Sequence, residues 1–431
     1  MKPISEVRIR VIDHGIFLPF ARCLAREAAH VDYYTPSEKA FPTIRDCCIG
    51  DGFDEVEKIV GPMVDSDSVD CWCFPDVGFE DVQADLLDRG KVVWGARNGD
   101  SLEIHRGKFL KALATTDLPV PPHQIVVGLD KLRQHLYDKE DKWVKISKLR
   151  GDFETFHWRN WEMDKAELDK YGVRFGPAQE RITFYVFDPI DTEIEDGVDT
   201  YCIDGKFPEL VIHGMEAKDR AFLAAFQNLA NLPEEVRKVS EAFAPILGAF
   251  GYRQFFSSEV RITPEKQSYF IDPTTRLGSP PSQVMCEMYG NLADIVWHGA
   301  NGVLIEPEPL HKYGVQAIIC GKGDRDTWSA YQFPEELDQW VKCGFCCRID
   351  GLLCFPPDPD ATSNDIGWLV GVGDSIKEAI EHLKEHAGLL PDGVTCEHHH
   401  LADLIDEVNE ADEAGVPFTE DAVPEPEIVV K

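Results

Sequence analysis

The sequence predicts an α/β protein whose central part is α+β in character, and three observations support this prediction. Its 431 residues are enough for more than one hydrophobic core, so two or three domains are expected. Over the first hundred residues, short β-rich runs alternate with helical patterns, which is typical of a parallel sheet with helices on both faces. Between about residues 119 and 305 the strand-like runs lengthen, which indicates antiparallel pairing.

The first domain is expected to span residues 1–118. Runs rich in apolar and β-branched residues predict its strands, at residues 7–12, 31–34, 69–74 and 91–94. Helical patterns lie between and after them, at residues 17–29, 80–89 and 102–114. A group of prolines, Pro119, Pro121 and Pro122, then interrupts the pattern and marks the domain boundary.

The second domain is expected to span residues 119–305, with a lid subdomain at about 119–200. Its predicted strands lie at residues 143–146, 181–187, 200–203 and 211–213. Two amphipathic helices are expected next, at residues 220–229 and 234–250. Residues 253–262 and 268–272 then predict a hairpin around a polar turn.

A small C-terminal α/β domain is expected at residues 306–408. Its clearest element is a helix, because Ser375 and Glu378 form a capping box and apolar residues follow at helical spacing to Ala387. Residues 409–431 are acidic and contain prolines, so a mobile or loosely docked tail is expected there.

The charge of the chain restricts its partners. With 43 basic and 77 acidic residues, the net charge is −34, which opposes binding to duplex nucleic acid or to anionic lipid. No apolar run approaches the roughly 18 residues of a membrane-spanning helix, so no membrane is expected as a partner. The chain enters its first strand too early for a signal peptide, which predicts a cytoplasmic protein.

The chain's thirteen cysteines fit reduced thiols in the cytoplasm. Cys343 and Cys346 form a C-x-x-C pair, which is typical of a redox site or of half a zinc site, but no second pair follows at zinc-finger spacing. Buried structural thiols are the favoured interpretation. Three consecutive histidines at residues 398–400 point in different directions on any regular element, so they do not predict a metal site.

Glu259 and Asp272 are the most informative pair of acidic residues. They lie on the two strands of the predicted hairpin, where they can point to one face and approach each other. A shared Mg²⁺ would compensate two carboxylates among apolar neighbours, and Arg276 just beyond could neutralise a transferring phosphoryl group. The alternative is an edge pair of acids balanced by Arg261 and Arg276.

Two lysines upstream are candidate phosphate ligands. Lys108 begins a helical run, and Lys145 lies inside an apolar strand, where a lysine is otherwise a solvated residue of the sheet face. Residues 148–152 follow, and Gly151 there permits a close approach of backbone to a nucleotide, so Arg150 would sit on a short flap over the phosphates.

The segment after the strand at residues 181–187 offers a second kind of nucleotide contact. Asp188, Pro189 and Ile190 form an extended connection whose backbone groups could bind an adenine. Asp199 follows and could hold ribose hydroxyls. Taken alone, this pattern is only a strand that ends in a turn.

In this order, the pieces resemble the ATP-grasp superfamily, and within it the phosphoribosylamine–glycine ligase (GAR synthetase) group. Residues 272–283, Asp-Pro-Thr-Thr-Arg-Leu-Gly-Ser-Pro-Pro-Ser-Gln, are similar to the family motif E-x-N-x-R-x-G-D-P-E-x-Q. Weaker similarities lie at residues 199–205, 216–220 and 371–379. The resemblance runs to about residue 390 and implies a Rossmann-like pre-ATP-grasp domain, a two-part ATP-grasp domain and a small C-terminal domain.

The resemblance also implies roles for single residues. Lys108 and Lys145 would bind phosphates, while Arg276 and Arg150 would serve the acyl-phosphate. The adenine hinge would be formed by Asp188, Pro189 and Ile190, the ribose would be held by Asp199, and the Mg²⁺ would be held by Glu259, Asp272 and Thr274. ATP and Mg²⁺ are the implied cofactors, with Mn²⁺ as an alternative.

Several positions depart from the family pattern. Thr274 stands where the family has a metal-binding Asn, Asp272 replaces a longer Glu, and Ser279 and Pro281 replace acids. The family's glycine-rich loop for the ribose phosphate is represented by residues 13–17, which contain a single glycine, whereas a phosphate cradle needs several free backbone amides. The amine substrate is therefore expected to differ from phosphoribosylamine.

The resulting hypothesis is an ADP-forming ligase that joins a small-molecule carboxylate to an amine through an acyl-phosphate. Its pocket should lie between the halves of the ATP-grasp domain and face His14 and Asp76 of the first domain. Two alternatives stay open. One is an ATP-grasp carboxylase, or a ligase that acts on a peptide or a modified nucleotide. The other is a catalytically silent binding or assembly protein that keeps the fold.

Overall fold

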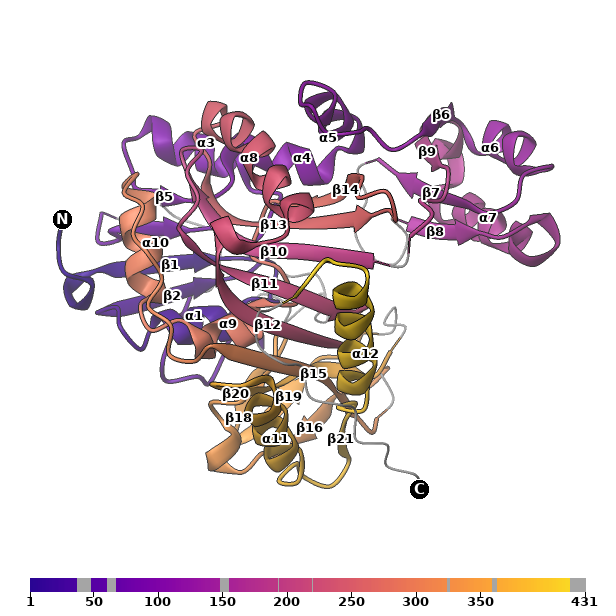
Figure 1. Cartoon of the computed structure of the whole chain (residues 1–431). Coiled ribbons are helices and arrows are strands. Elements are labelled where there is room, and N and C mark those ends of the chain that lie inside the picture. Colours follow the sequence, from indigo (N-terminus) through magenta and orange to yellow (C-terminus); the bar gives the residue numbers. More distant parts are fainter. Residues whose placement is uncertain are drawn as a thin grey trace.

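The computed structural model describes residues 1–36, 48–59, 67–147, 155–192, 194–218, 220–323, 326–358 and 363–418 (Figure 1). Within these residues the strands form four sheets, of five, nine, three and four strands. Parallel and antiparallel sheets occur together, which confirms the predicted mixture of α/β and α+β architecture. No helix of the described part is both long and apolar enough to cross a bilayer.

The N-terminal sheet is parallel, as expected, and its strands are ordered β3-β2-β1-β4-β5. Its elements, after a short 3₁₀ turn η1 (Ile4–Glu6), are β1 (Arg8–Ile12), α1 (Leu18–Leu24), β2 (His30–Tyr34), β3 (Glu57–Lys58), β4 (Cys71–Cys73), α3 (Glu80–Asp88) and β5 (Val93–Trp94). Both faces of this sheet are covered, because Ile9 and Val11 pack into one hydrophobic core while Ile12 and Trp72 pack into another. The loops that leave β1 and β4 lie together at the carboxyl edge of this sheet.

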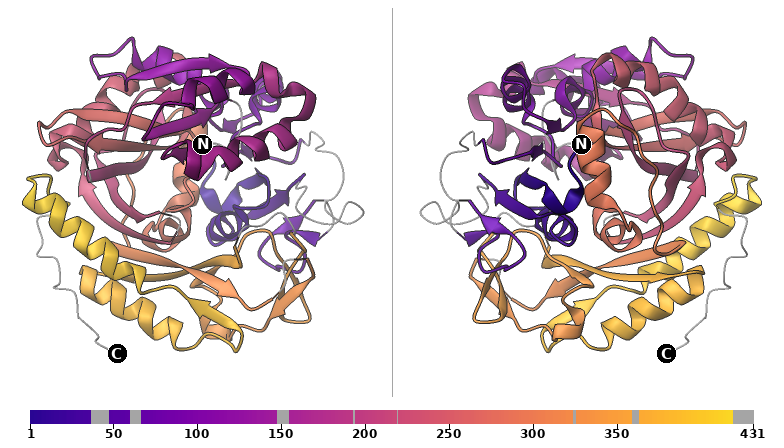
Figure 2. Two further views of the ribbon diagram at one scale, coloured as in Figure 1. Left: turned by 90° about the vertical axis from the view of Figure 1, so that its right-hand side faces the viewer. Right: turned by 90° about the vertical axis from the view of Figure 1, so that its left-hand side faces the viewer.

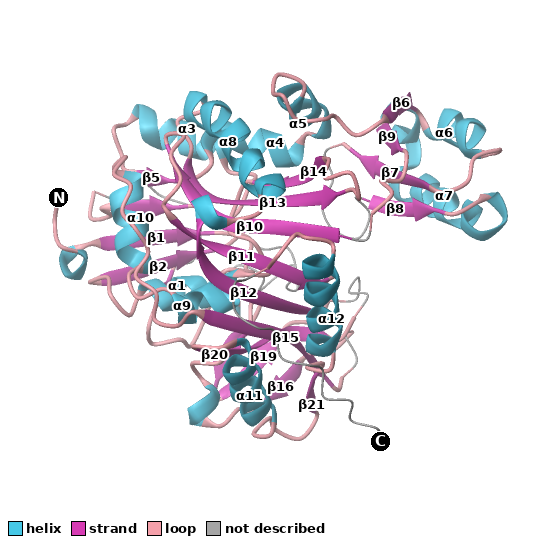
Figure 3. Ribbon diagram, viewed as in Figure 1, coloured by secondary structure: helices cyan, strands magenta, loops and turns pink. Residues whose placement is uncertain are grey.

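A lid of four antiparallel strands follows, after η2 (Arg97–Gly99), α4 (Asp100–Ile104) and α5 (Arg106–Leu113). We use the term lid for residues 123–187. The lid consists of β6 (His123–Val127), α6 (Leu129–Leu136), β7 (Lys142–Ile146), β8 (Thr155–Trp158), α7 (Trp161–Phe175), η3 (Gly176–Arg181) and β9 (Thr183–Phe187). It has a hydrophobic core of its own and projects to the right of the other sheets in Figure 3.

The central sheet has nine strands, eight of them in the order β14-β13-β10-β11-β12-β15-β20-β17, with β21 paired to β15. Its strands are β10 (Ile194–Ile203), β11 (Leu210–Ala217), β12 (Ala221–Asn228), β13 (Arg253–Ile262), β14 (Ser268–Thr274), β15 (Tyr313–Gly321), β17 (Val341–Lys342), β20 (Asp365–Gly373) and β21 (Val394–Cys396). The predicted hairpin is confirmed as β13 and β14. Residues 194–200, expected in the lid, belong to this sheet.

One helix of the second domain was predicted correctly and one wrongly. The helix α8 (Glu234–Ala249) buries Val236, Val239 and Phe243 in the same core as Val198 of β10. Residues 220–229, expected to be a helix, form the strand β12. Its run Ala-Phe-Leu-Ala-Ala-Phe is apolar throughout because the strand is interior to the sheet and buried on both faces, and periodicity cannot then separate a strand from a helix.

The C-terminal part continues the central sheet, because β15 pairs with β12. A separate three-stranded sheet is made of β16 (Ser329–Tyr331), β18 (Cys347–Ile349) and β19 (Leu352–Phe355). Remaining elements are η4 (Leu229–Asn231), α9 (Ser282–Met288), α10 (Leu292–Ala300), η5 (Glu335–Leu337), α11 (Ile376–Ala387) and α12 (His400–Glu413). Figure 2 shows α11 and α12 on the side of the molecule away from the N-terminal sheet.

The predicted tail begins inside a helix. α12 extends to Glu413, beyond the expected boundary at residue 409. Val416 and Phe418 are then buried, at 0% and 1% exposure, so the chain is docked against the sheet at least to residue 418. The apolar positions of α12, which the acidic composition obscured, provide that contact.

The predicted capping box of α11 gives a first testable effect on stability. The Ser375 hydroxyl accepts a hydrogen bond from the Glu378 amide at 3.2 Å, and Glu378 accepts one from the Asp374 amide at 3.0 Å. We expect Ser375→Ala to lower the free energy of unfolding by about 1 kcal/mol, the usual effect of losing an N-cap. Urea denaturation measures this change, and Ser375→Asp, which keeps the acceptor, should show little loss.

Candidate active site

Glu259 and Asp272 are direct neighbours across two strands. They are paired in register on β13 and β14, with a β-bulge immediately after Glu259. Their side chains are 30% and 25% exposed, so both carboxylates border solvent at the surface of a buried sheet. The structure therefore brings together the two acids that the hairpin pattern singled out.

Two cations from other elements hold the Asp272 carboxylate. Lys145 Nζ, on β7 of the lid, donates to one carboxylate oxygen, and the Arg106 guanidinium, on α5, donates to the other. Burial alone would raise the pKa of Asp272, but Arg106 and Lys145 together hold that pKa well below its usual range. Asp272 is thus the point where the lid meets the central sheet.

Glu259 has acidic neighbours instead. Burial raises the pKa of Glu259 well above its ordinary value, and the carboxylates of Glu195 and Asp272 raise it further. Lys218 Nζ, 3.6 Å from the Glu259 carboxylate, acts in the opposite direction. Glu259 therefore has two carboxylates and one lysine as neighbours, with less positive charge beside it than beside Asp272.

This crowding fits a divalent cation. Glu195, Glu259 and Asp272 offer the hard oxygen ligands that Mg²⁺ prefers, and a bound cation would remove the repulsion that raises the pKa of Glu259. Thr274, the third predicted ligand, is half-buried. It pairs with Ser257 on the same two strands, two residues along from the pair of Glu259 and Asp272.

The expected arginine partners have other contacts. Arg261 pairs with Glu195 at 2.9 Å, and Arg276 Nε lies 3.1 Å from Glu103 and 3.8 Å from Asp76. The alternative in which Arg261 and Arg276 balance the acid pair is therefore wrong for Asp272, whose cations are Lys145 and Arg106.

Asp199, the predicted ribose ligand, lies on β10 in register with Ser257 of β13. It is 7% exposed, and it accepts a hydrogen bond from the Ser257 hydroxyl. Burial raises the pKa of Asp199 to about 7, although the Ser257 bond acts in the opposite direction. Asp199 thus lies beside Ser257, which is two residues before Glu259 on β13.

The expected adenine hinge connects the lid to the central sheet. Asp188, Pro189 and Ile190 follow β9, and the Asp188 amide donates to the Pro122 carbonyl at 3.1 Å. Lys142 of the lid pairs with the Asp188 carboxylate at 3.0 Å. Asp188 and Pro189 are exposed and Ile190 is half-buried, so the segment is open to a ligand.

Arg276 joins the site to the first domain. Its partner Asp76 accepts a hydrogen bond from His14 Nδ1 at 2.9 Å, so His14 and Asp76 lie beside Arg276, while a pocket that faces them stays a prediction. Arg150, with the flap at residues 148–152, lies outside the described residues.

A search for known relatives by sequence gives nothing: no family model and no curated protein matches the chain. Its structure, in contrast, superposes on phosphoribosylamine–glycine ligase from Thermotoga maritima with a TM-score of 0.65 and 16% identity, covering 90% of this chain and 99% of that one. The chain has the ATP-grasp fold. This confirms the fold that residues 272–283 predicted.

Two carboxylases share the ATP-grasp fold with this chain. Biotin carboxylase from Campylobacter jejuni, solved as a complex with β,γ-ATP, matches with a TM-score of 0.61 and 15% identity over 94% of this chain and 97% of that one. The biotin carboxylase domain of 2-oxoglutarate carboxylase from Hydrogenobacter thermophilus was solved with MgADP and bicarbonate. It matches with a TM-score of 0.62 and 13% identity, covering 98% of this chain and 100% of that one.

Arg106 and Glu195 are the site residues that sequence reasoning missed. Lys108, predicted to bind phosphate, is exposed on α5, whereas Arg106 two residues earlier is 5% exposed and reaches Asp272. Arg106 carried no sequence signal beyond its place at the helix start. Glu195 alternates with Gly197 and Asp199 along β10, and this spacing of two could have placed it on the same face as Asp199.

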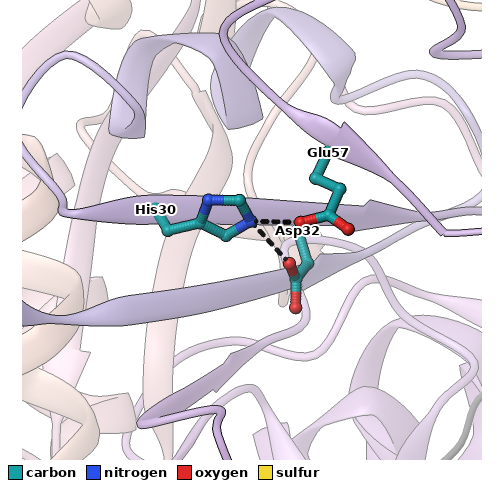
Figure 4. Close-up of side chains that lie close together, drawn as sticks. All are labelled: His30, Asp32 and Glu57. Atoms are coloured by element: carbon teal, nitrogen blue, oxygen red, sulfur yellow. Dashed lines mark hydrogen bonds and ion pairs between the residues drawn. The ribbon is translucent and has the colours of Figure 1, made fainter.

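A second group of potential metal ligands lies on the N-terminal sheet. Among the described residues, His30, Asp32 and Glu57 alone have three ligand atoms within 4.8 Å of one another (Figure 4). Arg8 contacts Asp32 at 2.7 Å and Glu57 at 3.2 Å, and Arg10 contacts Asp32 at 2.8 Å. The carboxylates are neutralised by arginines, so this is an ion-pair network.

The cysteine-rich segment has a structural character. Cys343, Cys346 and Cys347 are buried, and burial raises the pKa of Cys343 to about 12, so it stays a thiol. Every cysteine of the described chain is free. Of the three consecutive histidines, His400 bonds to Asp403 at 2.8 Å on α12. The Phe345 amide within the cysteine-rich segment donates to the Gly15 carbonyl at 2.8 Å, so this segment packs against the loop that follows β1.

The raised pKa of Asp199 gives a pH-dependent prediction. Its folded pKa, about 7, lies above the ordinary 3.8, so the folded state holds the proton more tightly and stability falls as pH rises between these values. We expect Asp199→Asn, which keeps an acceptor for Ser257, to abolish this fall. The gain in the free energy of unfolding over wild type should be about 3 kcal/mol larger at pH 8 than at pH 5, measured by urea denaturation.

Proposed function

We propose that this protein is an ATP- and Mg²⁺-dependent, ADP-forming ligase that joins a carboxylate to an amine through an acyl-phosphate. The observation that carries the proposal is the contact of Lys145, from the lid, with Asp272, which stands in register with Glu259 on the central sheet. The Lys145 ammonium group is thus beside paired carboxylates at the junction of lid and sheet, which supports Lys145 as a phosphate ligand. Such a pairing of charges serves to position and neutralise a transferring phosphoryl group.

Apart from metal binding, the site residues are proposed to have three roles: binding the phosphates, binding the nucleoside and neutralising the acyl-phosphate. Positive charge for the phosphates comes from Lys145, Arg106 and Lys218. The exposed Lys108 on α5 is a further candidate. Asp199 accepts hydrogen bonds from ribose hydroxyls, and the backbone of Asp188, Pro189 and Ile190 contacts the adenine. Arg276 and Arg150 neutralise the acyl-phosphate. The first group is supported by the contacts to Asp272 and Glu259.

Glu259, Asp272 and Thr274 would hold the metal, Mg²⁺ or alternatively Mn²⁺. When bound, the cation neutralises charge on the ATP phosphates during transfer. The MgADP in a carboxylase of the same fold supports this choice. Lys145 and Arg106 both donate to Asp272, and we infer that these cations turn from the carboxylate to the phosphates when nucleotide binds.

The chain's own residues then position the reactants and exclude water. A carboxylate oxygen of the first substrate attacks the γ-phosphorus, and ADP leaves. The amine attacks the acyl carbon, a C–N bond forms, and phosphate leaves. Closure of the lid over the central sheet keeps water from the acyl-phosphate.

The amine is proposed to differ from phosphoribosylamine. The loop at residues 13–17 offers one glycine, and its Asp13 carboxylate occupies the Phe17 amide, which a phosphate would need. A peptide or a modified nucleotide remains an alternative substrate within the same reaction class.

Binding without turnover is the second candidate function. It is favoured by Asp272, which already has a cation on each carboxylate oxygen, and by Thr274 in place of an amide ligand. An assembly protein of this fold would keep ATP affinity and lose catalysis.

The test is release of ADP and phosphate from ATP and Mg²⁺ in the presence of pooled amino acids, other carboxylates and amines. We expect release that requires both a carboxylate and an amine. ATP binding without stimulated release by any pool would favour the assembly protein. Absence of ATP binding would contradict both candidates.

A further inference from the structure

We propose that His14, oriented by Asp76, is the general base that removes the proton from the amine as it attacks the acyl-phosphate. The inference rests on the proposed ligase function and assigns a catalytic residue that accepts this proton. A base is required because an amine that has attacked an acyl carbon carries one proton too many until a base removes it.

His14 has the geometry of an oriented base. Its Nδ1 lies 2.9 Å from the Asp76 carboxylate, and its ring stacks on Phe79 with centroids 4.6 Å apart. With Nδ1–H directed to the carboxylate, the neutral ring carries its lone pair on Nε2. The side chain is 48% exposed, so a bound molecule can contact it, whereas Asp76 is 12% exposed and fixed.

The position of the dyad fits the same task. His14 follows β1 and Asp76 follows β4, which are adjacent parallel strands, and ligands of open α/β sheets bind at this carboxyl edge. Asp76 also lies 3.8 Å from Arg276, four residues after Asp272. His14 and Asp76 therefore lie on the first domain's side of Arg276, the arginine proposed to neutralise the acyl-phosphate.

Two other histidines with carboxylate partners do not meet these conditions. His213 bonds to Asp196 at 2.6 Å but is fully buried. His400 bonds to Asp403 at 2.8 Å on α12, on the far side of the molecule from the N-terminal sheet (Figure 1). His400 offers a matched control for that reason.

Charged groups around the ring favour a cationic amine. They are Asp13 on the same loop, Asp76 after β4 and Arg276 after β14, with Glu103 of α4 paired to the arginine. Two carboxylates near the imidazole, Asp13 and Asp76, attract an ammonium group, and the neutral histidine is the group that accepts a proton from the bound amine. An anionic, phosphorylated amine would be repelled by these two carboxylates.

The ammonium loses one proton to solvent on binding, and the amine lone pair forms the C–N bond to the acyl carbon. His14 Nε2 takes the second proton from nitrogen as the C–O bond to phosphate breaks and phosphate leaves with the electron pair. The imidazolium then returns its proton to solvent, and the products are the amide and inorganic phosphate.

The experiment compares wild type, His14→Gln and His400→Gln with two nucleophiles. Pooled carboxylates, ATP and Mg²⁺ are mixed either with hydroxylamine, which is largely uncharged at neutral pH and traps an acyl-phosphate as hydroxamate, or with pooled amines. We expect His14→Gln to keep hydroxamate formation within about twofold and to lose amine-dependent phosphate release by about 100-fold, the usual contribution of a general base. His400→Gln should match wild type in both.

A pH profile separates base catalysis from a structural role. Amine-dependent release by wild type should fall as pH is lowered and the imidazole is protonated, and His14→Gln should lack this fall. Equal loss of both reactions in His14→Gln, or loss of neither, would overturn the assignment. If wild type itself forms no hydroxamate, the ligase proposal fails first, and the role of His14 fails with it.

Discussion

Replacing Glu259 by Gln is expected to reduce substrate-stimulated ADP release by at least about 10³-fold, because several kcal/mol of charge stabilisation around the phosphates is lost. Glu259 stands beside Glu195 and Asp272, and its pKa is raised first by burial and then by repulsion from these two carboxylates. The amide of Gln keeps the shape of the side chain but cannot supply a negative ligand. Release assays with pooled substrates measure the change.

The same substitution should leave the fold intact. A carboxylate whose pKa is raised by its neighbours destabilises the folded state when ionised, so a neutral Gln should unfold no more readily than wild type at neutral pH. Glu241→Gln, on the exposed face of α8 beside Arg237, is the matched control. Unchanged ADP release in Glu259→Gln would remove Glu259 from the metal site.

Replacing Lys145 by Met is expected to weaken ATP binding by about 10- to 100-fold, the loss of a charged hydrogen bond of about 1.5–3 kcal/mol. Lys145 extends from the lid to the Asp272 carboxylate, where it can turn to a phosphate. Met has a similar length and no charge. Calorimetric titration with ATP and Mg²⁺ measures the dissociation constant.

A control from the same subdomain distinguishes a phosphate contact from a general effect of lid charge. Lys170 lies on α7 of the lid and pairs with Glu167 at the surface, so Lys170→Met should leave the affinity unchanged. Equal weakening by both substitutions would show that Lys145 acts through the net charge of the lid and does not bind phosphate directly.

Much of the fold could be predicted because local patterns and tertiary structure agree. Alternating strands and helices indicated the parallel sheet, and the polar turn between residues 262 and 268 indicated the hairpin that holds Glu259 and Asp272. β12 could not be recognised, since an interior strand with two buried faces has no alternation. The continuation of the central sheet through β15 depends on long-range pairing that no local pattern encodes.

The geometry of the candidate site was predictable where the register of a hairpin sets it. Glu259 and Asp272 could be paired from the hairpin alone, whereas the contact of Lys145 with Asp272 joins two separate sheets and could not be predicted from the strand that holds Lys145. Arg106 was missed because its partner Asp272 is 166 residues away, and only the tertiary structure joins them. The roles assigned to all of these site residues remain predictions.

Transfer of oxygen from substrate to phosphate tests the acyl-phosphate mechanism most directly. The wild-type protein is incubated with ATP, Mg²⁺, pooled amines and carboxylates labelled with ¹⁸O, and the released phosphate is analysed by mass spectrometry. We expect phosphate that carries one ¹⁸O atom, because the carboxylate oxygen that attacked the γ-phosphorus leaves with it. ADP release accompanied by unlabelled phosphate would contradict the ligase, since water would then have taken the phosphoryl group.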